Sequence, residues 1–110
     1  MGTVILLNKS HMGHGDVELG RKILATFLRK SIAITDLETI ALYNEGVKLA
    51  ATASPVATEL TMLHERGVDI LPCATCVDHF GLRDRLCVPK IGTMDEIVDA
   101  MKKADKVITL

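Results

Sequence analysis

The stretch TVILLN, residues 3–8, is a run of apolar side chains that is broken only by the polar residues at its two ends. A strand with one solvent-exposed face alternates apolar and polar residues, whereas a continuous apolar run is typical of a strand that is buried on both faces. Strands of that kind belong to parallel sheets, because helices cover the two faces of such a sheet. The run therefore predicts a strand of an α/β domain.

The same alternation continues along the chain. Further strands are expected at residues 37–44, 68–71, 87–91 and 106–110, and helices at residues 17–30, 55–66, 77–86 and 93–104. Residues 45–53 are expected to form a loop. Strands that helices connect run parallel with right-handed crossovers. We therefore expect one α/β domain over residues 1–110, with three α/β/α layers and a five-stranded parallel sheet.

Helix ends and apolar stripes support these bounds. We expect Asp16 and Ser54 to be helix N-caps, Gly67 to end the helix before it, and Thr93 with Glu96 to form a capping box. The apolar stripes predicted to face the sheet are Leu24, Phe27 and Leu28 with Gly20, then Val56, Leu60 and Leu63, and finally Ile97, Val98 and Met101. We expect Gly20 to allow a close approach between its helix and the sheet.

Composition excludes some function classes. The 110 residues carry a net charge of −1 and only three aromatic side chains, so neither a basic face nor a base-stacking platform is expected. We therefore predict no nucleic-acid binding. The apolar run at the start is too short for a signal peptide or a membrane span, which predicts a cytoplasmic protein without membrane association. Thiols in that reducing compartment are more often catalytic or metal-binding than structural.

Polar and glycine-rich loops follow the first three predicted strands. In an open parallel sheet the loops at the carboxyl ends of the strands share one edge, and ligands bind there. We expect residues 9–15, 44–50 and 73–76 to meet at that edge. The candidate binding residues are His11, Gly13, His14, Gly15, Gly46, Lys48 and His79. The histidines could exchange protons near neutral pH, and Lys48 could hold an anion.

The third loop contains a Cys-x-x-Cys pair, Cys73 and Cys76. Cys73 is expected to end a strand and Cys76 to open a helix, with Thr75 as the N-cap and Asp78 completing a capping box. The free N–H groups and positive dipole at a helix start favour a thiolate and lower a cysteine pKa. The pair therefore predicts a reactive thiol at the rim of the crevice.

Two other interpretations of the cysteines remain open. Cysteine is often a small buried apolar residue, which is the expected role of Cys87. A tetrahedral zinc site could use Cys73, Cys76, His79 and Cys87, but the second Cys-x-x-Cys knuckle of a zinc ribbon is missing. We therefore predict neither a metal nor another cofactor.

The segment CATCVDHFGL, residues 73–82, resembles the Cys-x-x-Cys-x-Asp-x-x-Gly-Leu signature of the DsrE/DsrF-like family. Three further stretches resemble its YedF-type branch, which is linked to selenium metabolism. They are SHMGHGDVELG at 10–20, NEGVKLAATASPV at 44–56 and GTMDEIVDAMKKADKVITL at 92–110. The resemblance covers nearly the whole chain. It differs in one respect, since YedF-like chains typically begin with a TusA-like domain that carries a Cys-Pro-x-Pro motif, and these 110 residues contain none. The chain is therefore expected to be either a stand-alone form or an excised domain.

The resemblance implies a strand order of 4-3-2-1-5, homotrimers or homohexamers, and sulfur-relay chemistry with TusA-like donor or acceptor proteins. In family members with that chemistry, the sulfur acceptor is a cysteine eight residues before a glycine. Cys73 stands eight residues before Gly81, so the resemblance assigns that role to Cys73.

These observations predict a sulfurtransferase, or a carrier of sulfur or selenium, that works through a cysteine persulfide. Cys73 would take the sulfur, and Cys76 would release it by closing a disulfide. Two alternatives stay open at this point. One is a dithiol module that reduces disulfides or peroxides, and the other is a non-catalytic domain that binds a small anion or a partner.

Overall fold

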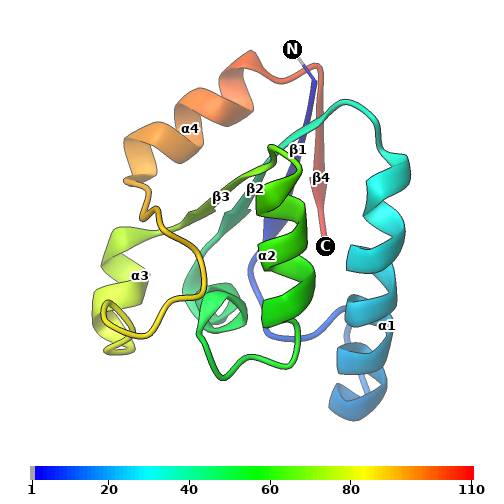
Figure 1. Cartoon of the computed structure of the whole chain (residues 1–110), viewed down its shortest axis with the longest axis vertical. Coiled ribbons are helices and arrows are strands. Elements are labelled where there is room, and N and C mark those ends of the chain that lie inside the picture. Colours follow the sequence, from blue (N-terminus) through cyan, green and yellow to red (C-terminus); the bar gives the residue numbers. More distant parts are fainter. Residues whose placement is uncertain (1) are drawn as a thin grey trace.

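A computed structural model describes residues 2–110. Strands and helices alternate along the chain (Figure 1). In chain order the elements are β1 (Thr3–Leu7), α1 (Val17–Lys30), the 3₁₀ helix η1 (Ser31–Ala33), β2 (Leu37–Leu42), the 3₁₀ helix η2 (Asn44–Ala50), α2 (Ala57–Glu65), β3 (Asp69–Pro72), α3 (Ala74–His79), α4 (Met94–Lys103) and β4 (Lys106–Thr109).

The strands form one parallel sheet in the order β3-β2-β1-β4. The first strand lies inside the sheet, where Ile5 is in register with Ile40 of β2 and Ile108 of β4. All five residues of β1 are buried. The prediction from the apolar run at residues 3–8 is therefore confirmed: a parallel strand covered on both faces.

The predicted fifth strand at residues 87–91 does not form, so the sheet has four strands among the described residues 2–110. This segment contains Pro89, which has no N–H to donate to a neighbouring strand. Directly after this segment, Gly92 forms a single parallel bridge with Cys73, the residue that follows β3. The expected order 4-3-2-1-5 is thus wrong in its outermost strand, and the remaining four strands keep the expected neighbours.

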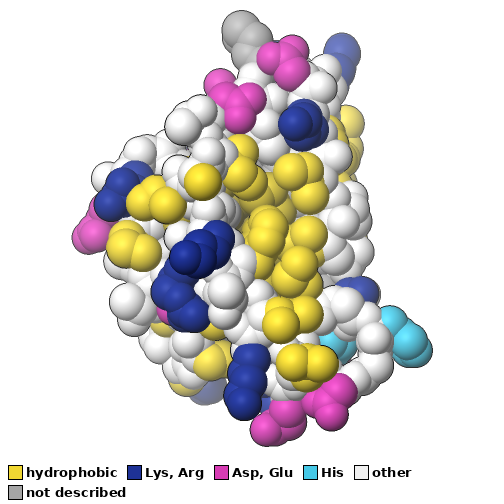
Figure 2. Space-filling view, turned by 90° about the vertical axis from the view of Figure 1, so that its right-hand side faces the viewer, with side chains coloured by type: hydrophobic (Ala, Val, Ile, Leu, Met, Phe, Trp, Pro, Cys, Tyr) yellow, Lys and Arg dark blue, Asp and Glu magenta, His cyan; other side chains and the backbone are white. Residues whose placement is uncertain are grey.

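Helix α1 and the edge strand β4 lie on the same side of the molecule (Figure 1). Figure 2 shows hydrophobic side chains gathered over this side, with charged groups around them. The exposed apolar residues of these two elements are Val17, Leu19, Ile23 and Val107, which we call the apolar band. The opposite stripe of α1 faces the core as predicted, since Gly20, Leu24 and Leu28 are buried and Phe27 packs against the core.

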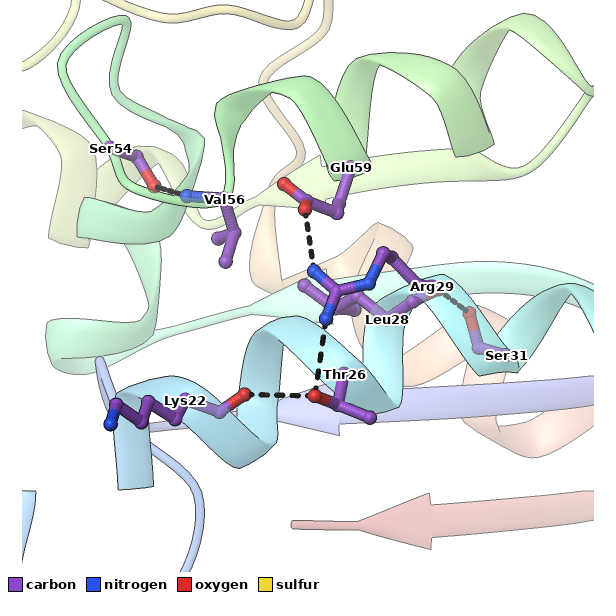
Figure 3. Close-up of polar contacts among 8 residues, drawn as sticks. All are labelled: Lys22, Thr26, Leu28, Arg29, Ser31, Ser54, Val56 and Glu59. Atoms are coloured by element: carbon purple, nitrogen blue, oxygen red, sulfur yellow. Dashed lines mark hydrogen bonds and ion pairs between the residues drawn. The ribbon is translucent and has the colours of Figure 1, made fainter. Parts of the chain in front are cut away.

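Helices α1 and α2 pack beside each other, and a polar link joins their exposed rims (Figure 3). Arg29 of α1 donates one hydrogen bond of 3.2 Å to Glu59 of α2 and another of 3.2 Å to Thr26 on its own helix. Beneath this link, the predicted stripe of Val56, Leu60 and Leu63 is buried. The link orients the two helices, whereas the buried side chains supply most of the stability.

Several predicted helix boundaries are corrected. Ser54 does not cap α2 directly, because its hydroxyl accepts the N–H of Val56 at 3.1 Å in a turn, and the helix begins at Ala57. Residues 44–50 form η2 rather than a loop. The helix expected at residues 77–86 is instead α3, which starts earlier and ends before a turn in which Gly81 has a φ of 64°.

The caps of α1 and α4 are confirmed. Asp16 accepts the N–H of Leu19 at 2.9 Å, and Thr93 with Glu96 forms the complete capping box. The predicted apolar stripe of α4 holds only in part, because Ile97 is buried but Val98 is 50% exposed.

Candidate functional site

The two cysteines lie where β3 passes into α3. The N–H of Cys73 donates to the carbonyl of Leu42 at 2.8 Å and so extends the ladder between β2 and β3 by one residue. The carbonyl of Cys73 then accepts the N–H of Val77 at 2.8 Å and closes the first turn of α3. Cys73 is therefore the N-cap of α3, and the prediction that Thr75 holds this position is wrong.

The two thiols differ in their access to solvent. Cys73 is 3% exposed and packs within the hydrophobic core, so the prediction that it opens onto the crevice is wrong. Cys76 lies on the first turn of α3 and is only half-buried. It lines a pocket of about 270 Å³ together with Asn44, Thr75, His79 and Phe80. The thiol that a donor molecule can reach in this structure is therefore Cys76.

Opposing effects act on the ionisation of Cys76. Partial burial raises its pKa above the ordinary value, and the neighbouring Cys73 thiol raises it further. The backbone N–H of Asn44, which donates to Cys76 Sγ at 3.1 Å, lowers the pKa but does not outweigh burial. The expected acidic thiol is therefore wrong for Cys76. Since α3 has only six residues, its dipole is weak and does not offset the cost of desolvating a thiolate at Cys76.

The candidate residues named from the sequence omit three residues of the pocket, Asn44, Thr75 and Phe80. Asn44 adopts a φ of 50°, a left-handed conformation that Asn tolerates better than most residues, and its N–H points at the thiol. An Asn two residues after a buried strand was the available signal. Phe80 makes an edge-to-face contact with His79, with 4.9 Å between the ring centroids.

The structure brings two of the predicted binding residues to this pocket. His79 lines it directly. The ammonium group of Lys48 lies 4.6 Å from the ring centroid of Phe80, on the rim. The acidic neighbour Asp78 turns away and pairs with Arg83 through two hydrogen bonds of 2.8 and 2.9 Å, which lowers the pKa of its carboxyl group.

Gly46 is buried and has a structural role near the pocket. A side chain at this position would collide with the carbonyl oxygen of Leu7 at the end of β1. The missing side chain allows η2 to sit directly on the sheet edge, and η2 in turn positions Asn44 and Lys48.

The first loop does not reach the Cys76 pocket, so the expected meeting of three loops is wrong for His11, Gly13, His14 and Gly15. Met12 donates its N–H to the carbonyl of Gly20 at 3.1 Å, which folds the loop back onto α1. A side chain on Gly20 would crowd Met12 and His11, so this glycine allows close contact with the loop rather than with the sheet. Gly13 and Gly15 have φ values of 83° and 124° and form the exposed turn.

A zinc site and a membrane-spanning segment were also considered from the sequence. Within residues 2–110, no group of three or more His, Cys, Asp or Glu side chains is arranged to hold a metal ion. The four ligands considered from the sequence therefore do not gather into one site. Among the helices of the same residues, none has the length and apolar composition needed to cross a membrane.

Comparison with known proteins gives one family and several structural neighbours. The family model described as DsrE/DsrF-like matches residues 1–110. The search of curated proteins gives no match. Among solved structures, the ychN protein from E. coli superposes with a TM-score of 0.71 at 20% identity over 100% of both chains.

Two structures of proteins of unknown function are also similar in fold. MTH1491 from Methanobacterium thermoautotrophicum gives a TM-score of 0.71 at 20% identity, over 98% of this chain and 97% of its own. BT1422 from Bacteroides thetaiotaomicron gives 0.68 at 19% identity, over 99% and 95%. At these identities the structural neighbours show the fold alone.

Proposed function

Since the chain belongs to the DsrE/DsrF-like family, we propose that it carries sulfur as a cysteine persulfide and that Cys76 is the residue that receives it. The observation that carries this proposal is the setting of the Cys76 thiol, which lines an open pocket while the N–H of Asn44 points at its sulfur. That N–H stabilises the negative charge that Cys76 Sγ carries in the attacking thiolate.

The proposed uptake step is an exchange without net oxidation. The Cys76 thiolate attacks the outer sulfur of a donor persulfide, a new S–S bond forms on Cys76, and the S–S bond of the donor breaks. The donor leaves as a thiolate and takes up a proton. An acceptor thiolate can then attack the outer sulfur on Cys76 and restore the Cys76 thiolate.

Cys73 is proposed as the second thiol of the site rather than the first acceptor. Its thiolate attacks the inner sulfur of the Cys76 persulfide, forms a Cys73–Cys76 disulfide and expels hydrosulfide. The two cysteines are oxidised while the carried sulfur is reduced, and an external thiol must then reduce the disulfide. The effect of Cys73 on the pKa of Cys76 supports this pairing, because it requires the two groups to be close. Selenium in place of the outer sulfur would follow the same exchange.

Intact-mass measurement after incubation with a persulfide donor tests the assignment. Wild type and Cys73→Ser are expected to gain one sulfur atom that maps to Cys76, and Cys76→Ser is expected to gain none. The matched control is Cys87→Ser, which removes a thiol that is half-buried outside the pocket. Uptake by Cys76→Ser at the wild-type rate would overturn the assignment.

A dithiol module that reduces disulfides or peroxides is the second candidate, and the effect of the neighbouring Cys73 thiol on the pKa of Cys76 also favours it. It needs no sulfur donor, so turnover with peroxide and a thiol reductant alone would select it over sulfur transfer. A non-catalytic binding domain would instead leave both thiols unreactive towards alkylating reagents.

The proposal extends to partners. TusA-like proteins are the expected donor or acceptor in the cytoplasm, and copies of this chain are expected to associate as trimers or hexamers. The apolar band on α1 and β4 supports association, because exposed apolar patches of this kind commonly form protein interfaces. Light scattering on the wild type and on Ile23→Glu tests the oligomer, with a lower mass expected for the variant.

A further inference from the structure

A second cavity, like the Cys76 pocket, has residues of η2 in its lining. It measures about 520 Å³ and is lined by Ser10, Arg21, Glu45, Lys48, Leu49 and Pro55. Consecutive residues of η2 face the two spaces, because Asn44 lines the Cys76 pocket and Glu45 lines the second cavity. Neither Arg21 nor Ser10 is among the candidate binding residues named from the sequence.

Lys48 connects the two spaces. It lines the second cavity, and its ammonium group lies 4.6 Å from the ring centroid of Phe80, which lines the Cys76 pocket. A cation held over an aromatic face is attracted by the ring and keeps its remaining hydrogens free for an acceptor. A ligand whose sulfur meets Cys76 can therefore continue past Phe80 to Lys48 and then to Arg21.

The protein makes only weak ion pairs with the two positively charged side chains of the second cavity, Lys48 and Arg21. Lys48 lies 3.7 Å from Glu45, and Arg21 lies 3.9 Å from Glu18. Both are single contacts between side chains that are at least 44% exposed, and pairs of this kind contribute little. Each cation can thus exchange its protein partner for a carboxylate of a ligand. Glu45 is the one acidic residue in the lining, and it opposes such a ligand.

Building on the proposed function, we infer that the sulfur donor is a small persulfide with carboxylate groups, which Lys48 and Arg21 bind while its outer sulfur faces Cys76. The volume of the second cavity lies within the range of about 300–1,000 Å³ that small-molecule sites occupy. The chemistry is the uptake step given above, with the thiolate of the small donor as leaving group. The two cations position the donor and take no part in the bond exchange.

Rates of Cys76 persulfidation by two probes test this inference. Glutathione persulfide carries two carboxylates, and its dimethyl ester carries none but has the same reactive sulfur. Lys48→Gln and Arg21→Gln are each expected to slow the reaction with glutathione persulfide about threefold to tenfold and to leave the ester rate unchanged. Glu45→Gln is expected to raise the reaction rate of the anionic probe only. Lys22→Gln is the matched control, since it removes an exposed positive charge of α1 outside the cavity.

The ester also separates the failure of this inference from failure of the proposed function. If a variant slows both probes equally, the side chain acts on the thiol itself and the recognition of carboxylates is refuted. If the wild type uses both probes at the same rate, the site does not select anionic donors, although Cys76 still carries sulfur. If neither probe modifies Cys76 and a persulfidated TusA-like protein does, the donor is a protein and the inference is overturned. Failure of all three donors would refute the proposed function as well.

Discussion

Alkylation of the native protein with iodoacetamide is expected to label Cys76 long before Cys73. Cys73 is 3% exposed, and exposing it requires the first turn of α3 to leave the core. That opening uncovers Val77, which is fully buried, at a cost of about 1.5–3 kcal/mol. It also breaks the two backbone hydrogen bonds of Cys73, to Leu42 and Val77, at about 1 kcal/mol each. The sum is about 3.5–5 kcal/mol.

Since about 1.4 kcal/mol corresponds to a factor of ten, an opening of this size slows labelling of Cys73 by roughly two to four orders of magnitude. The assay quenches the reaction at increasing times, digests the protein and locates the label by fragment ions, because both cysteines fall in one short segment. Protein unfolded in urea is the control, where the two thiols should react at similar rates. Labelling of native Cys73 within tenfold of Cys76 would refute the burial argument and restore Cys73 as a direct acceptor.

Three further predictions concern stability. Gly46→Ala is expected to cost about 1–3 kcal/mol in urea unfolding, because the added carbon meets the Leu7 carbonyl; an unchanged midpoint would contradict the close approach of η2. Thr93→Ala is expected to cost about 1 kcal/mol by removing the cap of α4, whereas Thr93→Ser should retain most of the stability. Burial raises the pKa of Cys76 and Cys87 in the folded protein. The stability that the two protonated thiols contribute is therefore complete below pH 9.0, the ordinary pKa of a cysteine, and is lost as the pH rises through their pKa in the folded protein. Urea titrations from pH 8 to 11 should show this loss in the wild type and a smaller one after both thiols are changed to serine.

Most of the fold could be predicted from local sequence signals, because each of these signals depends only on residues that are close together in the chain. The apolar run at residues 3–8, the cap at Asp16 and the capping box at Thr93 each act over a few residues, and the structure confirms all three. The predicted strand at residues 87–91 failed because an edge strand depends on a long-range partner, and Pro89 weakens that pairing.

The site could be predicted only in part. The sequence located the cysteines at the junction of a strand and a helix, and it included His79 and Lys48 among the binding residues. It could not show that the first loop bends away onto α1, because that depends on the hydrogen bond between Met12 and Gly20.

The order of residues was enough to predict a parallel α/β domain with a dithiol at the carboxyl edge of its sheet, since strand burial and helix periodicity depend on local sequence. Which thiol faces solvent depends on how the helices and strands pack. Packing of α3 places Cys73 in the core and Cys76 beside the N–H of Asn44, which lies 32 residues away in the chain. Burial and contacts across such distances depend on how elements pack, and no local pattern specifies them.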